Sequence, residues 1–174
     1  MAIIVEGFDN SGKSTLAASF HLTVAHPGPR PKNEEEERLC LEHQLMTCGN
    51  LIVMDRVTSL STPAYSGNTS VRYGSYLRRM LDTPYCVLVY CRPPIEVIKD
   101  FSRHICKSYD EASKVQWLHD HAEEIVERYD FMMSQVPHRV YDYTNPDLEL
   151  HGAALSSLIH REEWKKWDTR NIND

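Results

Sequence analysis

The chain has 174 residues and a formal net charge of −6, from 19 Lys and Arg against 25 Asp and Glu. Hydrophobic residues make up 41% and charged residues 25%. This balance is typical of a globular chain and excludes a disordered or collagen-like one. The length suits a single domain over residues 1–174. The acidic balance argues against bulk nucleic-acid binding but leaves small anionic ligands open.

Simple sequence features also bear on location. No apolar run approaches the roughly 20 residues that a membrane helix needs, so we expect no membrane partner. The chain opens without a basic segment before its first apolar run, so we expect no signal peptide. The five Cys form no C-x-x-C pair, which favours reduced thiols over a disulfide framework or a zinc site. Together these features predict a cytoplasmic protein.

The first third of the chain alternates short apolar runs with helix-forming segments. In chain order we expect a strand over Ala2–Glu6, a helix over Lys13–His21, a short strand over His21–His26, a loop over Pro27–Pro31 and a helix over Glu34–Thr47. Asn33 is the predicted N-cap of that last helix. The four acidic residues that follow it lie where the helix dipole favours negative charge.

The remainder continues the alternation. We expect a strand over Leu51–Asp55, a polar loop over Thr58–Thr69, a helix over Arg72–Leu81, a strand over Tyr85–Tyr90, a helix from Pro94 to Arg103, a polar irregular stretch over His104–Ser113, a long helix over Lys114–Ser134, a strand over Arg139–Tyr143 and a helix over Asp147–His160. Alternating strands and helices predict a parallel sheet covered on both faces. The fold class is therefore α/β, a three-layer α/β/α sandwich with a five-stranded parallel sheet.

One motif in the chain carries recognisable chemistry. The segment Gly7–Ser14 reads G-F-D-N-S-G-K-S and matches G-x-x-x-x-G-K-[ST] in full, between a predicted strand and a predicted helix. Glycines let such a loop wrap a phosphate closely, and successive backbone N–H groups then point at the anion. Lys13 supplies a point charge for the β- and γ-phosphates, and the Ser14 hydroxyl is a ligand for Mg²⁺. We therefore expect an ATP site formed by Gly7, Asn10, Ser11, Gly12, Lys13, Ser14 and Thr15.

An acidic and a basic residue follow the next strong strand. Asp55 ends the run Leu51–Asp55, and a carboxylate in that place beside a phosphate loop can hold Mg²⁺. We therefore predict Ser14 and Asp55 as the metal ligands. Arg56 comes directly after and would project toward a second ligand.

These two motifs resemble those of a known family. Val5–Thr15 is similar to the opening of thymidylate kinases and related nucleoside monophosphate kinases, which carry E-G-x-[DE]-x-x-G-K-[ST]-T. Asp55-Arg56 resembles the family's Asp-Arg pair, in which the Arg contacts the acceptor's monophosphate. The resemblance implies a P-loop kinase fold, ATP and Mg²⁺ as cofactors, and transfer of the ATP γ-phosphate to a nucleoside monophosphate such as dTMP. It also implies a homodimer.

The resemblance further assigns roles by position. It implies catalytic roles for Lys13, Arg56 and Asp9, and a lid over about 103–114 whose cations Arg103 and Lys107 would close over the γ-phosphate. For the acceptor we predict contacts from Arg56, from Arg30 in the loop after the second strand, and from Arg72 and Tyr73 in the helix after the Ser/Thr/Pro-rich segment.

Other functions share the same phosphate loop. A kinase for another acceptor, such as a nucleoside, a modified base in a polynucleotide or a small-molecule alcohol, would carry it as well. A non-catalytic nucleotide-binding regulatory protein is the alternative from another class. A switch GTPase would need an N-K-x-D-like motif, and Asn145-Pro146-Asp147 lacks the Lys.

Overall fold

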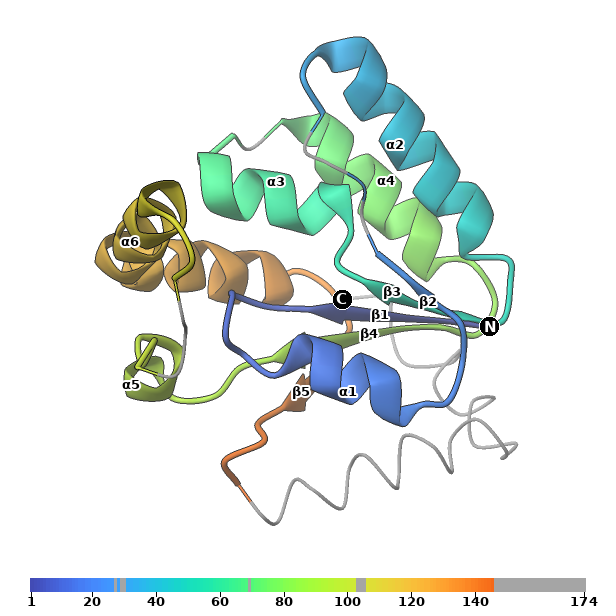
Figure 1. The fold of residues 1–174 in the computed structure, drawn as a ribbon. Coiled ribbons are helices and arrows are strands. Elements are labelled where there is room, and N and C mark those ends of the chain that lie inside the picture. Colours follow the sequence, from blue (N-terminus) through green and yellow to red (C-terminus); the bar gives the residue numbers. More distant parts are fainter. Residues whose placement is uncertain (27, 29–30, 69, 103–105, 146–174) are drawn as a thin grey trace.

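A computed structural model of the chain describes residues 1–26, 28, 31–68, 70–102 and 106–145 (Figure 1). The elements, in chain order, are β1 (Ala2–Glu6), α1 (Lys13–Ser19), β2 (Val24–Ala25), α2 (Glu34–Thr47), β3 (Ile52–Asp55), α3 (Thr58–Ser66), α4 (Val71–Leu81), β4 (Cys86–Cys91), α5 (Ile95–Ile98), α6 (Tyr109–Met133) and β5 (Arg139–Tyr141). Asn33 caps α2 as predicted, because its side chain accepts a hydrogen bond from the N–H of Glu36 at 2.9 Å.

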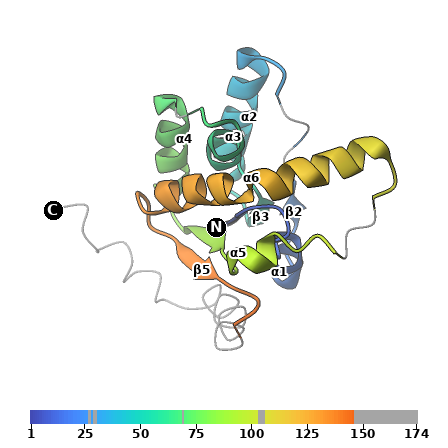
Figure 2. The same cartoon turned by 90° about the vertical axis from the view of Figure 1, so that its left-hand side faces the viewer.

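The strands of the described residues form one parallel sheet in the order β2-β3-β1-β4-β5. This arrangement confirms the predicted α/β class with a five-stranded parallel sheet. Because all the strands run in the same direction, their carboxyl ends meet at one edge of the sheet. Figure 2 views the molecule from the side to which β1 points, with α6 crossing above the strands. Ligands of open α/β sheets bind at this edge.

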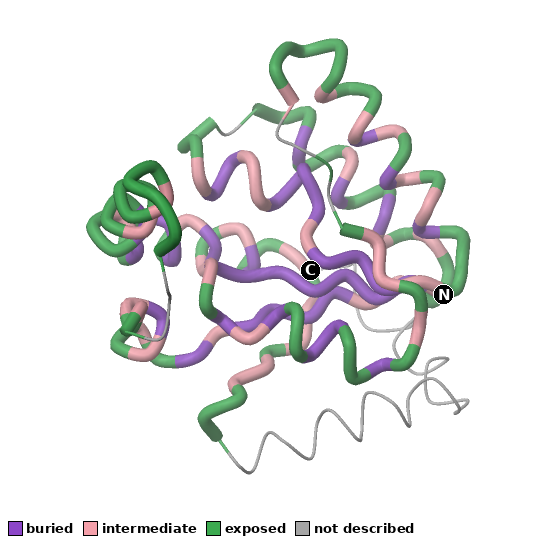
Figure 3. The backbone as a smooth tube through the Cα atoms, in the orientation of Figure 1, coloured by how far each residue is buried: buried purple, intermediate pink, exposed green. Residues whose placement is uncertain are grey.

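Both faces of the sheet are covered, which is why β1, β3 and β4 are apolar over most of their length. Along β1, Ala2 and Ile4 pack into the core beneath α3, α4 and α6, whereas Ile3 and Val5 pack against α1 on the opposite face. Every residue of β1 is buried, as the purple centre of Figure 3 shows. Burial on both faces holds the end of β1 rigidly, and the phosphate loop starts from that end.

The predicted elements differ most from the structure in two segments of the chain. The polar loop expected over Thr58–Thr69 is instead the helix α3, although Pro63 lies inside it. Leu60 and Ala64 are fully buried in the core. The Ser61 hydroxyl donates to the Val57 carbonyl at 3.0 Å, which satisfies a polar group that would otherwise favour a turn. Tertiary burial therefore outweighs the loop-like composition.

The second difference concerns the segment after β4. The helix expected from Pro94 to Arg103 is the short α5, which ends at Ile98. The long helix begins earlier than expected, at Tyr109, because Ser108 caps it by accepting from the N–H of Glu111 at 3.2 Å. The helix predicted over Asp147–His160 lies outside the described residues, as do the predicted site residues Arg30 and Arg103. No helix among the described residues has the length and apolar character to span a membrane.

Candidate active site

The phosphate loop connects the end of β1 to the start of α1, and two glycines set its path. Gly7 has φ 143°, and a Cβ there would lie 2.4 Å from the carbonyl oxygen of Cys91 in β4. Gly12 has φ 83°, and a Cβ there would lie 2.8 Å from the ring of Tyr143. A side chain at either position would push the loop away from its neighbours. The sequence places glycine where the loop touches the sheet and the segment after β5.

Lys13 is buried, with 6% of its surface exposed. Its ammonium Nζ donates to the carbonyl of Phe8 and, at 3.4 Å, to the hydroxyl of Ser11. Burial, and then the nearby Arg56 guanidinium, lower the pKa of Lys13 to about 8, although Asp9 and Glu6 oppose the shift. The protonation of Lys13 therefore depends on how much negative charge lies beside its ammonium group.

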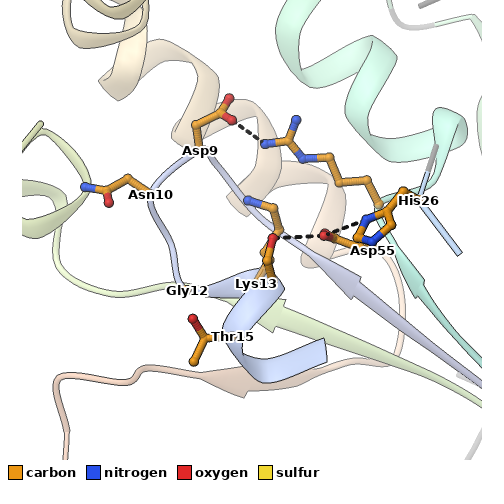
Figure 4. Close-up of a pocket in the computed structure, with 9 residues that line it drawn as sticks. Asp9, Asn10, Gly12, Lys13, Thr15, His26 and Asp55 are labelled. Atoms are coloured by element: carbon orange, nitrogen blue, oxygen red, sulfur yellow. Dashed lines mark hydrogen bonds and ion pairs between the residues drawn. The ribbon is translucent and has the colours of Figure 1, made fainter. Parts of the chain in front are cut away.

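The predicted metal ligands meet across the loop. The Ser14 hydroxyl donates to Oδ2 of Asp55 at 3.0 Å, so two oxygen ligands suited to Mg²⁺ lie side by side (Figure 4). Nδ1 of His26 lies 3.3 Å from the same carboxylate oxygen. Nowhere in the described residues do three or more His, Cys, Asp or Glu gather into a metal cage. The residues present fit a Mg²⁺ that takes its other ligands from phosphate and water.

An ion pair lies between the phosphate loop and the end of β3. Nη2 of Arg56 donates to Oδ1 of Asp9 at 2.8 Å, and the Tyr65 hydroxyl donates to Oδ2 of Asp9 at 2.6 Å. Burial raises the pKa of Asp9, but the Arg56 charge and the Tyr65 hydrogen bond outweigh it, so the net shift is downward. Asp9 is therefore an ionised carboxylate. The Arg56 backbone adopts φ 75°, an uncommon conformation for a residue with a side chain.

Two clefts of the described structure share Asp9 and Arg56. The first, of about 420 Å³, is lined by the phosphate-loop residues Asn10, Gly12, Lys13, Ser14 and Thr15, with His26 and Asp55. The second, of about 560 Å³, extends from Arg56 between α2, α3 and α6 and is lined by Gly28, Pro31, Cys40, Gln44, Thr58, Ser61, Thr62, Tyr65, Lys114, Trp117 and Leu118. Asp9 and Arg56 thus form the boundary between the cleft at the phosphate loop and a larger neighbour.

Glu6 lies beneath both clefts and lines neither of them. It is fully buried, where Oε1 accepts from the N–H of Val57 at 2.5 Å, and Oε2 accepts from the N–H of Gly7 at 3.2 Å and from the Tyr129 hydroxyl at 3.1 Å. Burial raises the pKa of Glu6 to about 7, although the hydrogen bonds from the N–H groups of Val57 and Gly7 and the nearby cations Arg56 and Lys13 oppose the shift. Glu6 therefore joins the phosphate loop, the β3–α3 junction and α6.

Asn10 lines the first cleft, but its side chain points away from Lys13 (Figure 4). Its Nδ2 donates to the carbonyl of Asp100 at 2.8 Å and to that of Val97 at 3.1 Å, with Ile98 at 3.4 Å. The amide therefore binds the carboxyl end of α5, and the residue adopts φ 65°. Asn10 therefore directs its side chain to the protein and away from the cleft. Gly7 and Ser11, which were also predicted to bind ATP, do not line this cleft.

The structure does not bring the remaining predicted residues to the clefts. Tyr73 is buried and its hydroxyl donates to Glu37 of α2, and Nη1 of Arg72 lies 3.8 Å from the same carboxylate. Both residues face α2 because α4 packs against α2. The sequence alone did not indicate that these two helices are neighbours. Lys107 is exposed just before α6 and lines neither cleft.

Some cleft residues were missed by the sequence analysis. His26 follows β2, and the pairing of β2 with β3 brings it to Asp55. Three others, Thr58, Ser61 and Thr62, come shortly after Asp55-Arg56 in the chain. Their position just after the end of a strand could have indicated that they lie near the site. Gln44 and Trp117 lie in the middle of helices and reach the second cleft only through helix packing. No local pattern distinguishes them.

The sequence matches no protein-family model and no curated protein. Solved structures do resemble this one. The YorR protein of Bacillus subtilis, in complex with phosphorylated GDP, has a TM-score of 0.66 at 19% identity, covering 91% of this chain and 95% of that one. Deoxyadenosine kinase of M. mycoides with bound dATP has a TM-score of 0.54 at 16% identity, covering 92% and 100%. Shikimate kinase of Aquifex aeolicus has a TM-score of 0.55 at 15% identity, covering 91% and 96%.

This chain has the P-loop kinase fold. The likeness extends over about nine-tenths of the chain and includes kinases whose named substrates differ. A shared fold does not determine the acceptor, because function depends on the residues of the site. The choice among acceptors therefore rests on the two clefts and the residues between them.

Proposed function

We propose that the protein is an ATP-dependent kinase that transfers the γ-phosphate of ATP to a nucleoside monophosphate such as dTMP. The observation that carries this proposal is the position of Arg56, which lines both clefts. A guanidinium binds phosphate oxygens through paired N–H donors, and it is always charged. Arg56 is therefore suited to hold an acceptor phosphate at the boundary where the donor phosphate ends.

The donor nucleotide is assigned to the first cleft. Its phosphates would lie against the backbone N–H groups of the phosphate loop, with Lys13 close to the transferred group. Ser14 and Asp55 would hold Mg²⁺, which neutralises charge that develops on the phosphate oxygens. His26, beside Asp55, would help to orient that carboxylate.

The transfer step needs positioning and charge compensation more than proton transfer. An oxygen of the acceptor phosphate forms a bond to the γ-phosphorus as the bond from that phosphorus to the β–γ bridging oxygen breaks, and ADP leaves. A fully ionised monophosphate carries no proton on the attacking oxygen, so no general base is required. A hydroxyl acceptor would require one, and Asp9 is a poor base because its pKa is lowered beside Arg56. This difference favours a phosphate acceptor over a nucleoside or an alcohol.

The test is an acceptor panel. The protein is incubated with ATP and Mg²⁺ and each of the common ribo- and deoxynucleoside monophosphates, and ADP release is measured. We expect at least one monophosphate to stimulate ADP release well above the rate with ATP alone. Nucleosides, shikimate and simple sugars serve as comparison acceptors. Stimulation by one of these and by no monophosphate would overturn the proposed acceptor class.

Lys13→Ala provides the matched variant for the panel. Removing a cation that stabilises the transferred group costs on the order of 10³ or more in kcat, so the variant should lose acceptor-stimulated ADP release. Lys32→Ala, at an exposed position outside both clefts, is the control and should keep it. Substantial turnover in Lys13→Ala would exclude the phosphate loop as the site of transfer.

A further inference from the structure

The second cleft has room for more than a phosphate. It occupies about 560 Å³ and begins at Arg56, where the proposed acceptor phosphate is held. Neither Arg72 nor Tyr73, which the sequence predicted to contact the acceptor, lines it. Whatever recognises the rest of the acceptor must therefore come from the other walls. Two of these side chains, Trp117 and Gln44, have features suited to a flat, polar-edged ring.

Trp117 contributes an aromatic wall from α6. The residue is 42% exposed and lines the second cleft. Its indole stacks on His121 with ring centroids 4.5 Å apart and planes 21° apart. Nδ1 of His121 also lies 2.8 Å from the Trp117 carbonyl, so the two residues support each other along the helix. His121 covers one face of the indole, and Trp117 contributes part of the cleft surface. Such a surface is suited to stacking against a planar ring.

Gln44 contributes a fixed amide from α2. The residue is 9% exposed and lines the same cleft. Its Oε1 accepts from the N–H of Thr58 at 2.9 Å, and its Nε2 donates to Oγ1 of Thr58 at 3.1 Å. The backbone N–H of Thr58 can only donate, so the amide cannot flip without losing this bond. A glutamine amide has two N–H donors and two acceptor lone pairs. Thr58 takes the N–H and the lone pair that lie side by side, so the free N–H and the free lone pair point to opposite flanks of the amide.

We propose that Trp117 and Gln44 form a nucleobase subsite, in which the indole stacks on the base of the acceptor and the Gln44 amide binds its edge. This inference rests on the proposed function and specifies its acceptor as an intact nucleotide. A sugar phosphate has no planar ring to stack on Trp117. The free N–H or the free lone pair of Gln44 can pair with one polar group on the edge of a base.

The fixed orientation of Gln44 has a consequence for selectivity. Thymine and guanine present a ring N–H beside a carbonyl, whereas cytosine and adenine present a bare ring nitrogen beside an amino group. In a given pose, an amide that cannot flip presents to the base either its free N–H, which pairs with a carbonyl, or its free lone pair, which pairs with an amino group. The subsite should therefore prefer the oxo bases or the amino bases, and should not treat both alike.

The first experiment compares acceptors with and without a base. Steady-state KM values are measured for the preferred deoxynucleoside monophosphate and for deoxyribose 5-phosphate, which carries the same phosphate and sugar. Trp117→Ala should raise the KM for the nucleotide by roughly tenfold and leave that for the base-free compound nearly unchanged. Trp117→Phe should keep most of the affinity, because it retains a stacking ring. Phe131→Ala, which removes another exposed aromatic of α6, is the matched control and should behave as wild type.

The second experiment reads binding without turnover. Stacking of a base on Trp117 should quench its fluorescence when the nucleotide is titrated into wild type or Phe131→Ala, and the quench should be lost in Trp117→Phe. A structural role for Trp117 would not produce this pattern. Persistence of the quench in Trp117→Phe, or an unchanged nucleotide KM in Trp117→Ala, would overturn the role of the indole.

Gln44→Leu tests the edge contact. Wild type should show roughly tenfold or larger differences in kcat/KM between oxo and amino bases, and Gln44→Leu should reduce them. Equal use of all four deoxynucleoside monophosphates by wild type, or an unchanged preference in Gln44→Leu, would contradict the inference while the kinase assignment stands. If no monophosphate stimulates ADP release, the proposed function fails, and the fluorescence titration still decides whether the subsite binds a base.

Discussion

At the scale of single residues, burial determines which groups of the site carry charge near neutral pH. Lys13 and Glu6 lie within the same few residues of the chain, and both are nearly or fully buried. Burial lowers the pKa of Lys13 to about 8 and raises that of Glu6 to about 7. Two groups with ordinary pKa values far apart therefore titrate close together, and each has a measurable consequence.

The pKa of Lys13 predicts an alkaline limit for ATP use. The protonated amine attracts phosphate, and raising the pH above about 8 removes its charge in the free protein. The value of kcat/KM for ATP reports groups of the free protein, so it should fall above that pH. A pH profile of kcat/KM measures this, with circular dichroism at each pH to verify folding. A profile that stays level through the alkaline range would contradict it.

The pKa of Glu6 predicts a pH-dependent contribution to stability. Between the usual pKa near 4.5 and the folded value of about 7, the folded protein keeps a proton that the unfolded chain has lost. Stability from this group is therefore greatest at acidic pH and is lost as the pH rises through about 7. Glu6→Gln removes the titration. Relative to wild type, its free energy of unfolding should improve by on the order of 1–3 kcal/mol from acidic to neutral pH.

Urea unfolding of both proteins over this pH range provides the measurement. Glu127→Gln, at an exposed carboxyl of α6 far from the loop in sequence, is the control and should track wild type. A constant difference between Glu6→Gln and wild type at every pH would indicate that the pKa of Glu6 is the same in the folded and the unfolded protein.

At the scale of secondary-structure elements, Asn10 connects the phosphate loop to α5. Replacing its amide with a carboxylate in Asn10→Asp would direct negative charge at the carbonyls of Val97 and Asp100. We expect this variant to lower the Tm and to raise the KM for ATP more than Asn10→Ala does, because repulsion is added to the loss of hydrogen bonds. Thermal unfolding and ATP kinetics measure the two effects.

Asn50→Asp is the control for Asn10→Asp, because it makes the same chemical change at an exposed position after α2. It should leave both the Tm and the KM near their wild-type values. Equal behaviour of Asn10→Asp and Asn10→Ala would show that the α5 carbonyls do not sense the added charge.

Elements also show where sequence-based prediction succeeds. The bounds of β1 and the N-cap of α2 depend on local signals, a β-branched run and an Asn before acidic residues, and both were predicted correctly. The helix α3 was missed because its composition favours a loop and only core burial of residues such as Leu60 selects the helix. Local signals likewise identified the phosphate loop and Asp55-Arg56. The acceptor contacts depend on how α2, α4 and α6 pack, and the sequence carries no local pattern for that.

At the scale of the whole molecule, the metal is expected to serve the reaction and not the fold. The core lies on both faces of the sheet and involves neither Ser14 nor Asp55. Removing Mg²⁺ with EDTA should therefore abolish acceptor-stimulated ADP release and leave the Tm of the protein unchanged. Activity assays and thermal unfolding in EDTA, with Mg²⁺ added back, test both halves. A large loss of Tm in EDTA would instead indicate a structural metal.

Because Asp9 and Arg56 form an ion pair, a carboxylate of the protein itself competes with the proposed acceptor phosphate for Arg56. The Asp9 carboxylate accepts from the guanidinium that the proposed acceptor phosphate needs. An arriving phosphate must therefore displace or share this internal anion, and part of its binding free energy is spent in doing so. The Tyr65 hydroxyl also binds Asp9, so it can retain the carboxylate when Arg56 turns to the substrate. Small anions such as sulfate should therefore be poor inhibitors. Only a ligand that also contacts other residues of the clefts can displace the Asp9 carboxylate from Arg56.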